Sequence, residues 1–214
     1  SSHPQLLAPA ETGFIPHLHY EGDSELSLSE VERLLARIGQ LNREWSGLVE
    51  DVQAFYQSLP EPRLAQVLDA LYRVRMDGSG ARRWGDKTPS YVLHLPLLSS
   101  IFPTAQFIHV IRDGRDATLS ADRKWGAQRW YMDQYYLLRN WVLHVEEGRA
   151  AGRVLGCDRY IEIHYEALVT EPESVLGTIC AFLGETLHPS MLDHTALART
   201  RIGPGGHVEV RRPI

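Results

Sequence analysis

One stretch of six residues, Gln106–Ile111, constrains the fold more than any other part of the chain. Its sequence, Gln-Phe-Ile-His-Val-Ile, is almost continuously apolar and rich in β-branched residues. Runs of this kind are typical of parallel strands that are buried on both faces of a sheet. The segment Tyr160–His164 is a second predicted strand, and helical patterns separate the two. This alternation predicts an α/β layered fold with a central parallel sheet flanked by helices.

Helical periodicity fills much of the remaining chain. Between residues 24 and 77, apolar side chains recur at three- and four-residue spacing, and Ser27 with Glu30 has the pattern of a capping box. We therefore expect a helical insertion or lid-like segment over 24–77, within a single domain that spans 1–214. Further helices are predicted for Tyr91–Ile101, from Asp116 to about Lys124, around Tyr135–Val145 and for Pro172–Leu183.

The composition excludes several classes of protein. Five Trp and nine Tyr among 43% hydrophobic residues supply enough apolar surface for a core, which excludes disorder as the main state. A net charge of −5 argues against a general nucleic-acid binder, but it leaves room for a local basic pocket. No apolar run reaches the roughly 20 residues of a membrane span. The two cysteines, Cys157 and Cys180, make no disulfide framework, although a single disulfide is an open alternative. The residues next to each cysteine predict buried or half-buried thiols.

The residues after the first predicted strand suggest an anion site. Arg112 ends this strand at the carboxyl edge of the sheet, where ligands bind in open α/β folds. Asp113 and Asp116 can cap the next helix, whose N-terminal N–H groups suit a phosphate. Arg112 can add a forked pair of charge-assisted hydrogen bonds, and Ser120, about two turns into the helix, a hydroxyl. The alternative is a salt-bridged turn formed by Arg112, Asp113, Arg115 and Asp116.

Two further segments contain candidate catalytic residues. Lys87, in Gly-Asp-Lys-Thr-Pro, ends a short extended piece, and an ammonium there can neutralise charge on a leaving oxygen. Glu11 lies in a loop with apolar neighbours, where a partly desolvated carboxylate can take a proton from a hydroxyl. The alternatives are a solvated turn lysine and an ordinary loop acid. His17 and His19 have a metal-ligand spacing, but no Cys, Asp or His cluster completes a site, and no metal is expected.

Several short blocks occur in a specific order: His3-Pro4, Glu11-Thr12, Gly-Asp-Lys-Thr-Pro at 85–89, Val110–Asp116, Ser120 and Tyr165-Glu166. Together they resemble the sulfotransferases that use 3′-phosphoadenosine 5′-phosphosulfate (PAPS), in the bacterial and tyrosylprotein-sulfotransferase-like branch. The resemblance covers most of the chain and is densest at 1–17 and 84–124. It implies a P-loop NTPase-like sulfotransferase fold and in-line transfer of a sulfuryl group to an acceptor hydroxyl. The products would be a sulfated acceptor and adenosine 3′,5′-bisphosphate (PAP), with no metal.

The resemblance also implies a role for each matching residue. Arg112 and Ser120 match the pair that holds the 3′-phosphate of the donor, and Lys87 matches the lysine that contacts the 5′-phosphosulfate and the bridging oxygen. Glu11 matches the glutamate proposed as the general base in the tyrosylprotein branch, whereas cytosolic relatives use a histidine. Arg201 and Gly203 occupy the place of a loop that closes over the nucleotide.

The chain departs from the family pattern at its beginning. Relatives start with a strand and a phosphate-binding loop just upstream of the His-Pro pair, which is His3-Pro4 here. We expect both to be missing from these residues, through truncation, a further N-terminal segment or supply by another chain. If these residues are the whole molecule, weak or absent catalysis is expected.

The expected partners are the nucleotide donor and a hydroxyl-bearing acceptor, without nucleic acid or a membrane span. The predicted compartment is the cytoplasm, or the Golgi lumen if an N-terminal anchor precedes the chain. A homodimer is an open alternative to a monomer. A nucleotide or sugar kinase and a non-catalytic nucleotide-binding domain are the alternative functions.

Overall fold

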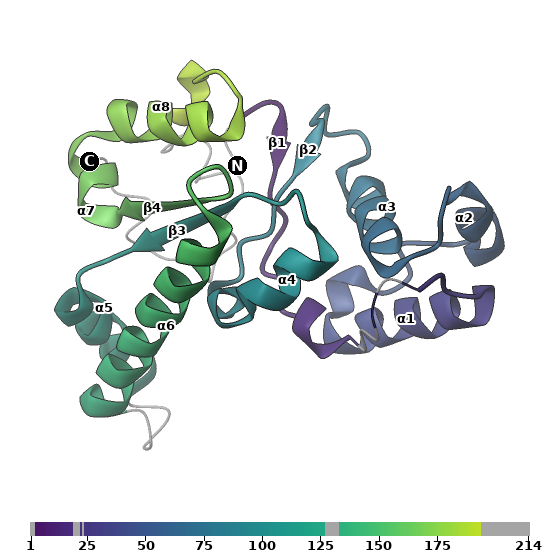
Figure 1. Cartoon of the computed structure of the whole chain (residues 1–214), viewed down its shortest axis with the longest axis horizontal. Helices are drawn as coiled ribbons and strands as arrows, with labels where there is room; N and C mark the ends of the chain where they lie inside the picture. The colour runs from purple at the N-terminus through teal and green to yellow at the C-terminus, as the bar shows by residue number, and fades with distance from the viewer. Residues whose placement is uncertain (1–2, 19–21, 23, 127–132, 194–214) are drawn as a thin grey trace. The chain divides into compact units, whose positions relative to one another are not determined.

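The computed structural model describes residues 3–18, 22, 24–126 and 133–193 (Figure 1). The chain divides into two compact units, residues 3–104 and 105–214. Each unit contains one pair of parallel strands with helices, so the predicted α/β class is confirmed. The single domain over 1–214, and a lid or insertion at 24–77, stay predictions. No helix among the described residues is long and apolar enough to cross a lipid bilayer.

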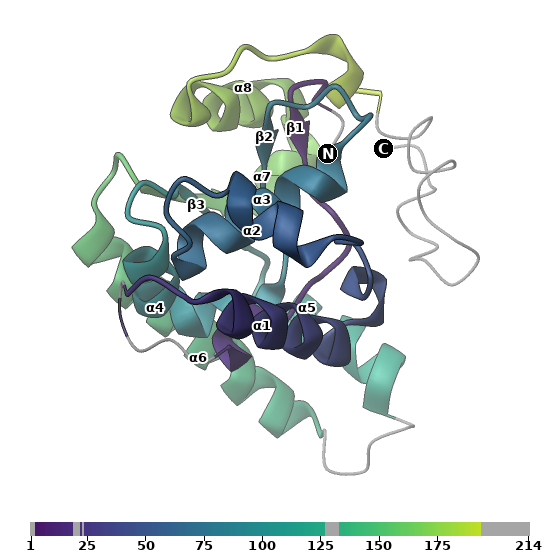
Figure 2. The same ribbon diagram turned by 90° about the vertical axis from the view of Figure 1, so that its right-hand side faces the viewer.

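The first unit is built on a short parallel pair. Strand β1 (Leu6–Leu7) pairs with β2 (Arg83–Trp84), and Leu7 lies opposite Trp84. Helices fill the sequence between and after these strands, and α1 packs against α2 (Figures 1 and 2). They are η1 (Ile15–His17), α1 (Leu28–Leu41), η2 (Arg43–Trp45), α2 (Val52–Ser58), α3 (Leu64–Met76), η3 (Pro89–His94) and α4 (Leu95–Ile101).

Local sequence explains where these helices begin. The predicted capping box is present. The Ser27 backbone N–H donates to Glu30 Oε2 at 2.7 Å, and the Ser27 side chain accepts from the Glu30 backbone N–H in the first turn of α1. The single helix expected over Tyr91–Ile101 is instead a 3₁₀ helix followed by α4. Pro96 lies in the first turn of α4, where its missing N–H costs no intrahelical hydrogen bond.

An aromatic column forms the core of the first unit. Tyr72 stacks on Trp84 with ring centroids 4.0 Å apart, and Trp45 packs on Tyr72 at 4.7 Å. Phe14 and Trp45 form a T-shaped pair, and so do Trp84 and Phe102. Such pairs add stabilisation to the large apolar area that the rings bury. The column joins the N-terminal loop, α3 and β2, which are distant in sequence.

The second unit is built on a longer parallel pair. Strand β3 (Phe107–Ile111) pairs with β4 (Tyr160–His164) in continuous register, from Phe107 opposite Tyr160 to Ile111 opposite His164. Both strands were predicted within one residue. The helical elements are α5 (Gly114–Ala121), a π-helical turn η4 (Asp122–Gly126), α6 (Gln134–Leu155), α7 (Tyr165–Thr170), α8 (Pro172–Leu183) and η5 (Pro189–Met191).

Two expectations for this unit are wrong. Strand β3 is not buried on both faces, because Ile108 and Val110 are 37% and 48% exposed. Successive side chains of a strand point to opposite faces, and α6 covers the face that carries Tyr160. Cys157 is exposed because it lies in the turn between α6 and β4, whereas Cys180 is buried as predicted, and both thiols are free.

Close packing of α6 on β4 gives a stability prediction. The Tyr160 ring occupies the space that a Cβ atom at Gly152 would fill. Gly152→Ala is therefore expected to lower the free energy of unfolding by about 1–3 kcal/mol through overpacking, measured by urea denaturation. Gly177→Ala in α8 is the matched control, since nothing lies within 4 Å of the added Cβ. That change should stabilise the protein by up to about 1 kcal/mol, and equal effects of the two would contradict the packing argument.

Candidate functional site

The parallel pair β1–β2 brings Glu11 and Lys87 together. Each residue follows its strand by a few positions, and the Gly85 N–H donates to the Leu7 carbonyl at 2.8 Å, which continues the pairing past β2. Parallel strands deliver their following loops to the same edge of the pair. The Lys87 ammonium consequently donates to Glu11 Oε1, although 76 residues separate the two.

The Glu11–Lys87 pair is open to solvent. The side chains of Glu11 and Lys87 are 54% and 68% exposed. The expected partial desolvation of Glu11 is therefore wrong. The loop leads its side chain out toward Lys87, while the next residue, Thr12, turns inward and is 5% exposed.

Thr12 belongs to a buried hydroxyl network beneath this pair. Its hydroxyl donates to Asp86 Oδ2, and it lies 2.8 Å from the Tyr91 hydroxyl. The Tyr72 hydroxyl also donates to Asp86 Oδ2, and the Thr88 hydroxyl donates to Oδ1 at 2.8 Å. The sequence indicated Asp86 only as part of the motif at 85–89. It held no signal for Tyr72, which has the spacing of an ordinary core residue of α3.

Both tyrosines of this network remain hydrogen-bond donors at neutral pH. Burial raises the pKa of Tyr91 to about 12, and hydrogen bonds from neighbouring groups offset part of that effect. Burial, followed by the negative charge of Asp86, raises the pKa of Tyr72 still further. A protonated phenol can donate its O–H, so the two rings stabilise acceptor groups beneath the Glu11–Lys87 pair.

In the second unit, Arg112 directly follows the last residue of β3, and three side chains of α6 and α7 hold its guanidinium and the adjoining backbone. The Trp141 indole donates to the Arg112 carbonyl at 3.0 Å, and the Glu166 carboxylate accepts from the Asp113 N–H at 2.8 Å. The Arg112 guanidinium lies over the Tyr165 ring, 5.2 Å from its centroid. Within the part of the chain that the structure describes, this guanidinium forms no ion pair. No hydrogen bond to another described residue engages its N–H donors, so this cation is open to an anionic ligand as far as the described residues go.

Asp113 is the N-cap of α5, as predicted. Its carboxylate accepts from the Arg115 and Asp116 backbone N–H groups, at 2.9 and 3.4 Å. Hydrogen bonds from the Arg115 side chain and then from these N–H groups lower the pKa of Asp113 to about 2. The alternative of a salt-bridged turn is correct for Asp113 with Arg115, at 2.9 Å, but Arg112 takes no part in it.

The predicted site residues that the structure describes are divided between the two units. Ser120 lies on α5, exposed, in the same unit as Arg112. Glu11 and Lys87 belong to the first unit. Arg201 and Gly203 lie outside the described residues, so their predicted role stays a prediction. No cluster of three potential metal ligands occurs among the residues that the structure describes.

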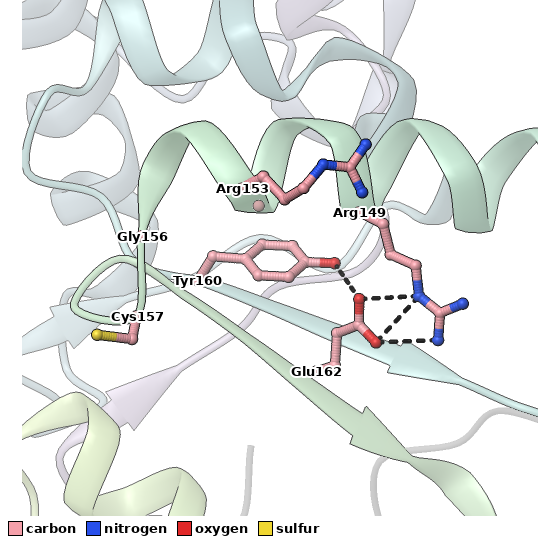
Figure 3. A pocket seen from close by; sticks show the side chains of 7 residues that line it. Arg149, Arg153, Gly156, Cys157, Tyr160 and Glu162 are labelled. Carbon is pink, nitrogen blue, oxygen red and sulfur yellow. Dashed lines mark hydrogen bonds and ion pairs between the residues drawn. The ribbon is translucent and has the colours of Figure 1, made fainter.

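A separate open pocket lies between α6 and β4 (Figure 3). It has a volume of about 480 Å³ and is lined by Arg149, Gly152, Arg153, Gly156, Cys157, Tyr160 and Glu162. Arg149 pairs with Glu162 at 3.1 Å, and the Tyr160 hydroxyl lies 2.6 Å from His109 Nδ1. Burial lowers the pKa of His109. Of the predicted catalytic and donor-binding residues that the structure describes, none lines this pocket.

Comparisons with known proteins agree with the resemblance seen in the sequence. The model of the sulfotransferase family matches residues 1–189. Protein-tyrosine sulfotransferase 2 of Gallus gallus is 28% identical over 85% of this chain and 50% of its own length. Protein-tyrosine sulfotransferase 1 of Danio rerio is 25% identical over 99% of this chain and 54% of its own length. The chain thus spans about half the length of these relatives.

Solved structures show the same fold. A sulfotransferase domain from the curacin biosynthetic pathway matches 98% of this chain and 74% of its own, with a TM-score of 0.59 at 18% identity. The sulfotransferase domain of the Synechococcus PCC 7002 olefin synthase matches 89% and 68%, with a TM-score of 0.52 at 24% identity. With a family match over most of its residues, the chain belongs to the sulfotransferase family.

Proposed function

We propose that this protein transfers a sulfuryl group from PAPS to an acceptor hydroxyl by in-line displacement. The observation that carries the proposal is the contact between Glu11 and Lys87, which puts a carboxylate base and an ammonium side by side. Family membership supports the donor, because PAPS is the general donor of the sulfotransferases. Transfer of this kind requires mainly that the reacting groups are positioned and that their charge is neutralised. A carboxylate base and an ammonium group meet these requirements.

Glu11 acts on the acceptor hydroxyl, and Lys87 acts on the leaving oxygen of the donor. A Glu11 oxygen accepts the proton of the acceptor hydroxyl as the acceptor oxygen forms its bond to sulfur. The bond between sulfur and the bridging oxygen breaks, and the electron pair stays on the 5′-phosphate of PAP. Lys87 stabilises the negative charge that develops on that oxygen. The ion pair has to open for this, since Lys87 then contacts the donor and Glu11 turns to the acceptor.

Arg112 and Ser120 anchor the 3′-phosphate of the donor. The Arg112 guanidinium is held over Tyr165 and engages no carboxylate among the described residues, so it can form a forked pair of bonds to phosphate oxygens. Asp113 keeps the backbone of the first α5 turn in place through its cap. The Ser120 hydroxyl adds a neutral donor. Arg201 and Gly203 would close over the nucleotide from the C-terminal segment.

The test is donor competition with the intact protein. With PAPS and a panel of acceptors, formation of a sulfated product is expected. The panel includes a tyrosyl peptide, as the names of the relatives suggest, together with a sugar and a small alcohol. ATP with Mg²⁺ should give no phosphorylated product. Phosphate transfer from ATP would favour a kinase, and PAP binding without any transfer would favour a non-catalytic domain. The cytoplasm and a homodimer stay predictions.

A further inference from the structure

We propose that Asp86 is a positioning residue that holds the loop carrying Glu11 beside the segment carrying Lys87. Its carboxylate joins the loop that carries the base to the segment that carries the cation. The inference rests on the proposed function, since it takes Glu11 and Lys87 as the reacting pair. Asp86 touches neither donor nor acceptor. It acts through the loop that carries Glu11 and the segment that carries Lys87.

The hydrogen bonds of Asp86 reach both segments at the residues next to the reacting groups. Oδ2 accepts from the hydroxyl of Thr12, the residue after Glu11. Oδ1 accepts from the hydroxyl of Thr88, the residue after Lys87, at 2.8 Å. The Thr12 N–H in turn donates to Thr88 Oγ1 at 3.1 Å. One carboxylate therefore connects two segments that are 74 residues apart in the chain.

The aromatic core holds this connection rigid. Tyr72, which is completely buried, donates to Asp86 Oδ2 while its ring is packed between Trp45 and Trp84. Tyr91 is 7% exposed, and its hydroxyl lies 2.8 Å from the Thr12 hydroxyl and accepts from the Ile15 N–H at 3.1 Å. Side chains locked by packing have few alternative rotamers, so the position of Asp86 is transmitted to its partners.

The charge of Asp86 matters because its hydrogen-bond partners among the described residues, Thr12, Tyr72 and Thr88, are all hydroxyl donors. An ionised carboxylate accepts from all three, and hydrogen bonds to a charged acceptor are roughly twice as strong as neutral ones. Asparagine has one acceptor oxygen and one NH₂ group, so at least one hydroxyl loses its acceptor. The Glu11 loop would not come free, because Asn42 Nδ2 donates independently to the Glu11 and Thr12 carbonyls. The expected result of Asp86→Asn is therefore misplacement of Glu11 and not unfolding.

The kinetic test compares two carboxylates. Misplacement of a reacting group by about 1 Å can cost about 100-fold in rate, so Asp86→Asn should lower kcat by about 10- to 100-fold with the KM for PAPS nearly unchanged. Asp69→Asn is the matched control. Asp69 also accepts from an aromatic side chain, the half-buried Trp84, whose Nε1 lies 2.8 Å away. Its other hydrogen bond comes from Arg73, and among the described residues neither bond reaches Glu11, Lys87 or the residues next to them. Its kcat should stay within about threefold of wild type.

A double-substitution cycle separates positioning from a general structural role. If Asp86 acts through Glu11, adding Asp86→Asn to Glu11→Gln should lower kcat by less than about threefold more. An equal fold loss in both backgrounds would overturn the inference. Should Asp86→Asn fail to fold, Thr88→Val replaces it, because it is isosteric and removes the hydroxyl between Asp86 and the Thr12 N–H. A Thr88→Val enzyme with wild-type kcat would also overturn the inference.

Hydrogen exchange tests the connection without any reaction. In Asp86→Asn, the amides of residues 8–14 should exchange faster than in wild type, while those of α1 stay unchanged. Unaltered exchange at 8–14 would overturn the inference, whatever the activity. A different pair of results would be faster exchange at 8–14 in Asp86→Asn together with full activity in Glu11→Gln. This pair would support the connection made by Asp86 but contradict the proposed function. The two failures are thus distinguishable.

Discussion

Replacing Lys87 with alanine is expected to lower kcat by about 100- to 1,000-fold, the usual loss when one group that stabilises developing charge is removed. The dissociation constant of PAPS should rise by less than about threefold, since the charge that Lys87 meets appears on the bridging oxygen only as sulfur departs. Single-turnover sulfation of a saturating acceptor gives the first quantity, and calorimetry with PAPS in the absence of acceptor gives the second. A variant that loses affinity more than turnover would contradict the assignment.

Two comparisons support the interpretation of Lys87→Ala. The ion pair with Glu11 is exposed on both sides, so its removal should change the free energy of unfolding by no more than about 1 kcal/mol. A large drop in Tm would therefore mean that lost activity reflects unfolding. Lys87→Arg keeps the cation but changes its shape, and it should recover part of kcat. No recovery at all would indicate that the ammonium geometry, and not charge alone, is required.

Replacing Arg112 with alanine is expected to weaken PAP binding by about 10- to 100-fold, because a hydrogen bond to a charged group contributes about 1.5–3 kcal/mol. Adenosine 5′-phosphate lacks the 3′-phosphate, so its affinity should be the same for wild type and variant. Calorimetry with both nucleotides measures the difference directly. If both ligands lost affinity equally, Arg112 would not read the 3′-phosphate.

Arg115→Ala is the matched control for Arg112→Ala. Arg115 lies three residues further along and is already engaged with the Asp113 carboxylate at 2.9 Å. Its removal should change PAP affinity by less than about threefold, which is within the effect of an exposed charge. Equal losses in the two variants would show a general dependence on positive charge at the start of α5.

The sequence predicted those parts of the fold that depend on neighbouring residues. The apolar run ending at Ile111 gave β3, and the Asp113 cap gave the start of α5. The capping box of Ser27 and Glu30 was also correct. Residues a few positions apart set these features, since hydrophobic period and caps act over one or two turns. The short blocks from His3-Pro4 to Tyr165-Glu166, taken together in their order along the chain, were enough to identify the family.

Burial could not be read from the same patterns. Ile108 and Val110 have the composition of a doubly covered strand, yet both are exposed, and Cys157 lies in an open turn. Whether a face is covered depends on what packs against it, and that is a property of the tertiary arrangement. Glu11 had apolar neighbours in sequence, but the loop turns its side chain out to Lys87.

The sequence alone determined the strands β3 and β4, most of the helices, the cap after β3 and the family of this protein. Only the tertiary structure decided that Glu11 meets Lys87 and that Asp86 gathers the hydroxyls of Thr12, Tyr72 and Thr88. Local patterns act over a few residues, whereas these contacts depend on which loops two paired strands bring to one edge. Periodicity carries no information about strand partners, so residues 74 to 76 positions apart can be matched only after the chain has folded.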